Sequence, residues 1–294
     1  MNGRKISSFG ATLLLLLALA PGATAGSGGF DGMAIPLAAP SPDWYTAELH
    51  AKAEAAGRKG KAIPLPDGVE VDSALLFTGV RPGSWMISPA WCTTNFVFGS
   101  ATGNLRSRSA KPPKPRAGNS GVYIGTAGHC ADTGESVSIV AAPGVIMNIG
   151  VTVKSIDNGV GDDFALIEIY PEMAQYVNPS MAILAGPTGS EAPAFGTAIT
   201  HVGHGLVVGT GGTARPGLVT WTDKTAYGWD GAAAPGDSGS GVRAAGGNAV
   251  GNLTHLVVGT RYLPAYIAGT TIDRMLQIAS APLATASLVP DPLP

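Results

Sequence analysis

The sequence predicts a mostly β-structured protein, on the basis of its composition and of the spacing of its apolar runs. Only 13% of the 294 residues are charged, whereas Gly occurs 42 times and Pro 23 times. This composition favours short strands joined by turns over long amphipathic helices. From about residue 85 onward, runs of β-forming residues such as GVYIGTAG and DFALIEI alternate with glycines. Such spacing is typical of a β-sandwich or a pair of β-barrels.

Residues 1–25 have the pattern of a secretory signal peptide. Arg4 and Lys5 precede an apolar run, and Ala23 and Ala25 form an A-x-A cleavage signal. We therefore expect cleavage after Ala25 and a secreted protein. No later stretch approaches the ~20 apolar residues that a membrane-spanning helix needs.

Residues 26–84 differ in composition from the rest, and we expect them to form a pro-region or N-terminal extension. Within them, PDWYTAELHAKAEAAGRKG predicts a helix that begins near Asp43 and ends at Gly57 or Gly60. His50 on this helix is expected to face solvent.

The C-terminal region predicts a closing helix followed by a tail. TTIDRMLQIA, residues 270–279, has apolar residues at helical spacing after two threonines that can cap a helix. Residues 282–294 are rich in Pro, and we expect a disordered tail.

The charge of the chain gives no reason to expect nucleic acid or an anionic membrane as a partner. The formal net charge is −2, and removal of Arg4 and Lys5 with the signal peptide makes it −4. The basic stretch 106–116 is spaced by prolines, as in a solvated loop.

The stretch APGDSGSGV, residues 234–242, places Ser238 among several glycines. Glycine lets the backbone turn sharply and approach a ligand closely, which suits a nucleophile at a tight bend. The same residue types are common in ordinary surface turns. The stretch alone leaves both interpretations open.

A serine nucleophile needs a base to accept its proton and a carboxylate to orient that base. His129 in GTAGHCAD directly follows a strand-like run, and Asp163 in GDDFALIEI precedes an apolar run that can draw it inward. The order His, Asp, Ser is that of the chymotrypsin-like triad. An α/β-hydrolase built on Ser238 is excluded, because no acidic residue lies between it and His255, the only later His.

Cys92 and Cys130 are the only cysteines in the chain. An even count in an exported protein predicts one disulfide rather than two free thiols.

TAGHC, DFALI and GDSGSGV together resemble the three signature blocks of the chymotrypsin-like serine peptidases, particularly the secreted bacterial streptogrisin-like members, over roughly residues 85–280. The resemblance implies two six-stranded antiparallel β-barrels with a C-terminal helix. The barrels are expected at 85–188 and 189–281, with the catalytic cleft between them.

The resemblance also implies a role for each site residue. His129 is expected to be the general base and acid, Asp163 its orienting partner and Ser238 the nucleophile. The N–H groups of Gly236 and Ser238 are expected to form an oxyanion hole. Cys92 resembles the family cysteine that pairs with the one after the catalytic His, here Cys130.

The sequence departs from the family pattern at two places. Asp237 has no freed IVGG amino terminus to pair with, so its partner is left open. The disulfide that usually braces the specificity pocket is absent, because Ala234 takes its first position.

The expected substrate-binding residues are Ala232, Thr254 and His255. Ala232 takes the position of the pocket base, where it offers no carboxylate to a substrate Lys or Arg. We therefore expect uncharged, mainly apolar residues before the scissile bond. If His255 faces the pocket, an acidic residue is favoured instead. Thr254 takes the place of the Ser that supports the triad carboxylate.

The sequence favours a secreted serine endopeptidase that acts on proteins or peptides as a monomer, without a cofactor or metal. His201 and His204 lie three apart, which places them on opposite faces of a strand and argues against a shared metal. One alternative is an inactive relative that binds peptides or glycans, and another is a secreted esterase.

Overall fold

The computed structural model describes residues 32–72, 76–100, 120–205, 212–259, 265–283 and 286–291. The expected signal peptide and the basic stretch 106–116 lie outside these residues. Within the described ranges, no helix combines the length and the apolar character needed to cross a membrane.

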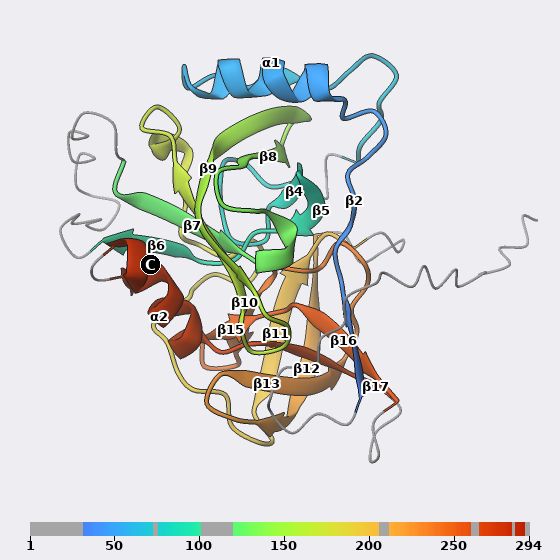
Figure 1. Ribbon diagram of the computed structural model, residues 1–294, viewed down its shortest axis with the longest axis vertical. Coiled ribbons are helices and arrows are strands. Elements are labelled where there is room, and N and C mark those ends of the chain that lie inside the picture. Colours follow the sequence, from blue (N-terminus) through green and yellow to red (C-terminus); the bar gives the residue numbers. More distant parts are fainter. Residues whose placement is uncertain are drawn as a thin grey trace, which may run out of the picture.

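Two antiparallel sheets, drawn one above the other in Figure 1, account for most of the structure. The first has the order β18-β6-β7-β10-β9-β8-β4-β5-β2, with β3 paired to β9, and the second has the order β1-β16-β17-β13-β12-β11-β14-β15. The strands of the first sheet are β2 (Ala39–Pro40), β3 (Ile63–Pro64), β4 (Trp85–Ser88), β5 (Ala90–Thr93), β6 (Val97–Ser100), β7 (Val122–Thr126), β8 (Ser136–Ala141), β9 (Val145–Asp157), β10 (Asp163–Ile169) and β18 (Ala286–Leu288). Those of the second are β1 (Met33–Pro36), β11 (Ala198–Gly203), β12 (Thr213–Thr222), β13 (Ala226–Gly231), β14 (Gly241–Ala244), β15 (Ala249–Asn252), β16 (His255–Val258) and β17 (Ala265–Thr270).

A bent strand closes each sheet into a barrel. In the first sheet β5 pairs with β4 and β6 pairs with β7, while residues 94–96 join β5 directly to β6. In the second, β15 pairs with β14 and β16 with β17, with residues 253–254 between them. If each bent pair counts as one strand, and β1, β2, β3 and β18 are set aside, each barrel has six strands among the described residues. The predicted two-barrel fold is confirmed.

The C-terminal helix α2 (Ile272–Leu283), predicted near 270–279, packs against β9 and β10 of the first barrel and against β15 of the second. Both faces of β10 are buried, because alternate side chains of a strand point to opposite faces and each face packs in a different cluster of apolar side chains. Ile167 joins the barrel core, whereas Phe164 and Leu166 pack in the cluster that contains Met275 of α2. Full burial of such side chains contributes about 1.5–3 kcal/mol each.

Residues 32–72 extend both barrels rather than forming a body of their own. β1 adds to β16, β2 to β5 and β3 to β9. The helix α1 (Ala47–Gly57) lies over β8 and β9, at the top of Figure 1. A Cβ atom on Gly57 would lie 2.1 Å from the Asn148 carbonyl oxygen, so only glycine allows this close approach.

Two expectations about this helix need correction. The helix begins at Ala47 rather than near Asp43, because the Thr46 side chain accepts the Leu49 N–H as an N-cap. His50 faces the barrel rather than solvent. Its Nδ1 lies 3.0 Å from the Ser88 hydroxyl and its Nε2 lies 2.9 Å from the Ser136 hydroxyl.

The expected disordered tail at 282–294 is also corrected. α2 continues to Leu283, and β18 pairs with β6 so that Leu288 packs against the α2 cluster. The Asp291 carboxylate accepts the Gly186 N–H at 3.2 Å. Within this stretch, residues 286–291 are therefore ordered, with β18 held by its pairing with β6 and by packing against the α2 cluster, while 284–285 and 292–294 lie outside the described residues.

The predicted disulfide is confirmed, since Cys92 of β5 and Cys130 are bonded with a Cα–Cα distance of 6.3 Å. We expect its removal by the double substitution Cys92→Ala/Cys130→Ala to lower the free energy of unfolding by about 3–4 kcal/mol, the chain-entropy value for such a loop. Urea unfolding measures this loss. An unchanged unfolding midpoint would show that the bond contributes nothing to stability.

Candidate active site

Asp163 and His129 meet at the edge of the first barrel. Asp163 is the first residue of β10 and is fully buried, while His129 lies in a short 3₁₀ turn, Gly128–Cys130, after β7. His129 Nδ1 lies 2.6 Å from Asp163 Oδ2. The second carboxylate oxygen accepts the backbone N–H groups of Gly128 and His129. These bonds fix the carboxylate and the plane of the imidazole.

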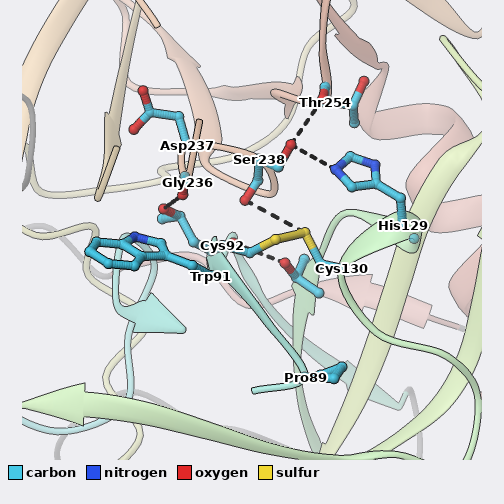
Figure 2. The surroundings of a disulfide bond; sticks show 12 residues. Pro89, Trp91, Cys92, His129, Cys130, Gly236, Asp237, Ser238 and Thr254 are labelled. Atoms are coloured by element: carbon cyan, nitrogen blue, oxygen red, sulfur yellow. Dashed lines mark hydrogen bonds between the residues drawn. A yellow bond between two sulfur atoms is a disulfide. The ribbon is translucent and has the colours of Figure 1, made fainter. Parts of the chain in front are cut away.

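Ser238 comes from the second barrel, in the turn between β13 and β14. Its hydroxyl lies 2.7 Å from His129 Nε2 and 2.9 Å from the Thr254 carbonyl oxygen (Figure 2). Because Nδ1 of a neutral imidazole donates to Asp163, Nε2 is left to accept the Ser238 proton. The structure thus brings the three predicted residues together in one hydrogen-bonded chain.

The N–H groups of Gly236 and Ser238 converge on one point. Both donate to the carbonyl oxygen of Leu37, at 2.6 and 3.3 Å. Gly236 has φ +103°, and a Cβ atom there would lie 2.8 Å from both the His204 carbonyl oxygen and the Trp91 ring. A glycine is required at this position for both reasons.

Asp237 has an internal partner that the sequence left open. Its buried carboxylate makes a two-pronged ion pair with Arg215 of β12, with N–O distances of 2.5 and 2.6 Å. It also accepts the N–H groups of Gly205 and Ala234. This anchor holds the turn that carries Ser238. Arg215 lies on the same face of β12 as the buried Val219, but nothing in the local sequence pairs it with Asp237.

Burial and charge shift the pKa values of His129 and Asp163 in opposite directions. Burial lowers the pKa of His129, but the charge and hydrogen bond of Asp163 outweigh it, so this pKa lies above its usual 6.5. Burial raises the pKa of Asp163, but the charge of His129 and its hydrogen bonds bring that pKa below the usual value. The pair therefore favours an ionised carboxylate and an imidazole with a raised pKa.

The Thr254 hydroxyl does not make the expected contact with Asp163, and His255 approaches that carboxylate instead. The Thr254 hydroxyl lies 3.3 Å from the Ala268 carbonyl oxygen and 2.9 Å from His255 Nδ1, rather than supporting Asp163. His255 Nδ1 lies 3.6 Å from Asp163 Oδ2, and burial lowers the pKa of this histidine to about 4. A neutral ring directed at the triad carboxylate does not support the preference for an acidic substrate residue.

The remaining predicted positions, Ala232, His201 and His204, lie in different surroundings. Ala232 is exposed, and its carbonyl accepts His201 Nε2 at 3.0 Å. Its neighbour Ala233 packs against the buried cluster that contains Leu37. His204 packs elsewhere, with its ring stacked on Trp85.

Among the described residues, two groups of side chains bring possible metal ligands within 4.8 Å of one another, namely Cys92, His129 and Cys130, and His129, Asp163 and His255. The sulfur atoms of the first group are joined in the disulfide and offer no thiolate ligand. In the second group the ligand atoms have other partners. Both ring nitrogens of His129 and both carboxylate oxygens of Asp163 are already hydrogen-bonded. The arrangement suits proton transfer along the chain better than metal ligation.

No family model and no curated protein matches this chain. Among solved structures, it is similar to a chymotrypsin of Cellulomonas bogoriensis (18% identity, TM-score 0.45, 73% of this chain and 98% of the other). It is also similar to protease A of Thermobifida fusca (19%, 0.47, 73% and 98%) and to a glutamic-acid-specific serine protease (16%, 0.47, 71% and 100%).

We expect Arg215→Met to lower the free energy of unfolding by about 3–5 kcal/mol, because it leaves the Asp237 carboxylate buried without its counter-charge. The matched control is Arg274→Met, whose partner Asp162 is 28% exposed, with an expected loss of about 1 kcal/mol or less. Urea unfolding compares the two, and the double variant Arg215→Met/Asp237→Asn should recover part of the loss. Equal losses for the two single variants would contradict a structural role for the buried pair.

We expect the pKa of His129, measured by NMR in a Ser238→Ala background, to lie above 6.5. Adding Asp163→Asn should bring it below 6.5, because burial then acts without the carboxylate charge. His255 should stay neutral between pH 5 and 8 and serves as the internal control. An unchanged His129 pKa after Asp163→Asn would show that the carboxylate does not tune the imidazole.

Proposed function

We propose that this chain is a serine hydrolase with His129, Asp163 and Ser238 as its catalytic triad. The proposal rests on the hydrogen-bonded chain from Asp163 through His129 to the Ser238 hydroxyl, together with two backbone N–H donors, of Gly236 and Ser238, that meet at one peptide carbonyl, that of Leu37. A surface turn needs no such convergence. Within this class, we propose a secreted, chymotrypsin-like endopeptidase that needs no cofactor.

The geometry supports a two-stage mechanism. His129 Nε2 takes the Ser238 proton as Oγ attacks a carbonyl carbon, and the imidazolium is stabilised by Asp163. The Gly236 and Ser238 N–H groups bind the developing oxyanion, and loss of one such donor typically costs 10²–10³ in rate. His129 then gives its proton to the leaving amine. Water releases the acyl group by the same steps in reverse order.

The apolar surroundings of Leu37 support a preference for uncharged residues before the scissile bond. Leu37 is 4% exposed and belongs to the cluster of Trp229, Val242 and Ile267. An unpaired Lys or Arg side chain in this cluster would cost several kcal/mol. Thr254 contributes through its carbonyl oxygen, which accepts the Leu37 N–H at 3.0 Å.

Covalent labelling and turnover assays distinguish this proposal from two other functions. An inactive relative that binds peptides would hold the cleft geometry but would not react covalently. An esterase would cleave ester substrates and leave matched peptides intact.

We expect a fluorophosphonate probe to label the wild-type chain at Ser238, and Ser238→Ala or His129→Ala to abolish turnover. The loss should be about 10⁶-fold in kcat, because triad residues act as a unit. Peptide and ester reporters assayed side by side measure turnover, and circular dichroism checks that each variant is folded. Near-normal peptidase activity in Ser238→Ala would overturn the assignment.

A further inference from the structure

The N-terminal segment of this chain runs through the candidate active site. In Figure 1 it is the blue strand that passes from the first barrel down beside β16. β1 pairs antiparallel with β16, from Met33 opposite Val258 to Pro36 opposite His255. Beyond Leu37, β2 pairs antiparallel with β5 of the other barrel. The segment therefore contacts both walls of the cleft.

Leu37 is held at the reacting position by both of its backbone polar groups. Its N–H donates to the Thr254 carbonyl at 3.0 Å, and its carbonyl oxygen accepts the Gly236 and Ser238 N–H groups. The hydroxyl of Ser238 is bonded to the imidazole base at the same place. The Leu37 carbonyl is thus the peptide group that both N–H donors bind, and one of these donors is the backbone N–H of Ser238 itself.

We propose that this chain cleaves itself between Leu37 and Ala38. The inference rests on the proposed function and adds a processing site, its sequence and its consequence for the cleft. Residues up to Leu37 form the acyl side of this internal substrate, and residues from Ala38 form the leaving side.

The side chains on the acyl side fit this role. Leu37 fills the apolar cluster that is proposed to receive the residue before the scissile bond. Pro36 has no N–H, but the pairing of β1 with β16 loses no hydrogen bond through it. Neighbouring residues of a strand direct their N–H groups to opposite sides, and the Leu37 N–H is the one directed at the second barrel.

The leaving side is anchored independently of the bond to be cut. The Ser41 hydroxyl donates to the Pro89 carbonyl at 2.9 Å, and Tyr45 donates to the Ser138 hydroxyl at 2.6 Å. The helix α1 then packs on β8 and β9. After cleavage, the chain from Ala38 onward stays on the first barrel. The upstream piece is then held only through the pairing of its strand β1 with β16 and the contacts of Leu37, among the described residues.

The step balances with one water molecule. Ser238 Oγ bonds to the Leu37 carbonyl carbon, the bond from that carbon to the Ala38 nitrogen breaks, and His129 transfers the serine proton to the new amine. Water then hydrolyses the Leu37 ester and restores Ser238. The products are a Leu37 carboxylate and a chain that begins Ala38-Ala39-Pro40. Departure of β1 opens the cleft to other substrates.

The test is to purify the full chain and follow its mass and its N-terminal sequence with time. We expect a product that begins at Ala38, formed at a first-order rate that does not depend on protein concentration, because substrate and site share one chain. Ser238→Ala should stay uncut under the same conditions, which excludes cleavage by a contaminating protease.

Two matched substitutions on β1 test the site itself. Leu37→Asp places a carboxylate in the apolar cluster and should slow cleavage about 100-fold or more. Met33→Asp places the same group at the exposed end of the strand, where Met33 is 42% exposed, and should cut at nearly the wild-type rate. Leu37→Met keeps an apolar side chain and should also be cut.

Failure of this inference can be distinguished from failure of the proposed function. An uncut wild-type chain, a product with another N-terminus, or equal rates for Leu37→Asp and Met33→Asp would overturn self-cleavage at this bond. Fluorophosphonate labelling of Leu37→Asp, in which the apolar side chain no longer fills the cleft, reports on Ser238 separately. A labelled but uncut Leu37→Asp chain, beside a wild-type chain cut at Ala38, supports both proposals.

Discussion

The burial of the Asp163 carboxylate is the constraint on which the site and the junction of the barrels depend. A buried carboxylate without partners would cost many kcal/mol, so it must be met by several donors. The 3₁₀ turn of the first barrel supplies the N–H groups of Gly128 and His129 and the imidazole. The backbone of Asp163 is held from the other side, where Thr270 bonds to its N–H and carbonyl and Asn252 donates to its carbonyl. One residue thus sets the imidazole and joins the two barrels.

A second junction brings Ser238 to that imidazole. The Thr93 N–H donates to the Ser238 carbonyl at 2.7 Å, and the Thr93 hydroxyl donates to the Gly236 carbonyl at 2.9 Å. Thr93 is next to Cys92, whose disulfide partner Cys130 follows His129, and Figure 2 shows this bond close to His129 and Ser238. His129 and Ser238 belong to different barrels but share this support. Their 2.7 Å separation is therefore a property of the junction rather than of either barrel alone.

The sequence predicted the parts of the site that are encoded locally. His129, Asp163 and Ser238 stand in short motifs whose neighbours indicate a strand end or a sharp turn, and the disulfide followed from a count of two. Arg215 was missed because its pairing with Asp237 depends on the register of β12, which no local pattern fixes. β18 was missed because prolines hid a few apolar residues whose burial depends on β6 and α2. The path of Leu37 was missed because composition separates residues 26–84 from the rest without indicating where they dock.

The internal partner of Asp237 decides what a cut at Leu37 can do. If Asp237 depended on an ion pair with an amino terminus released by cleavage, the turn with Gly236 and Ser238 would form only after that cleavage. Here Arg215 supplies the positive charge from within the second barrel, and the two N–H groups already meet a carbonyl in the uncut chain. Cleavage is therefore not needed to assemble the site.

While the bond between Leu37 and Ala38 is intact, β1 occupies the cleft and competes with other substrates for it. The contacts that make β1 a substrate also hold it there, because tethering to the same chain gives it a high effective concentration. Once the bond is cut, that advantage is lost, and the upstream piece must hold by the pairing of β1 with β16 and by the contacts of Leu37. The consequence of the cut is to clear a cleft that the buried ion pair has already built.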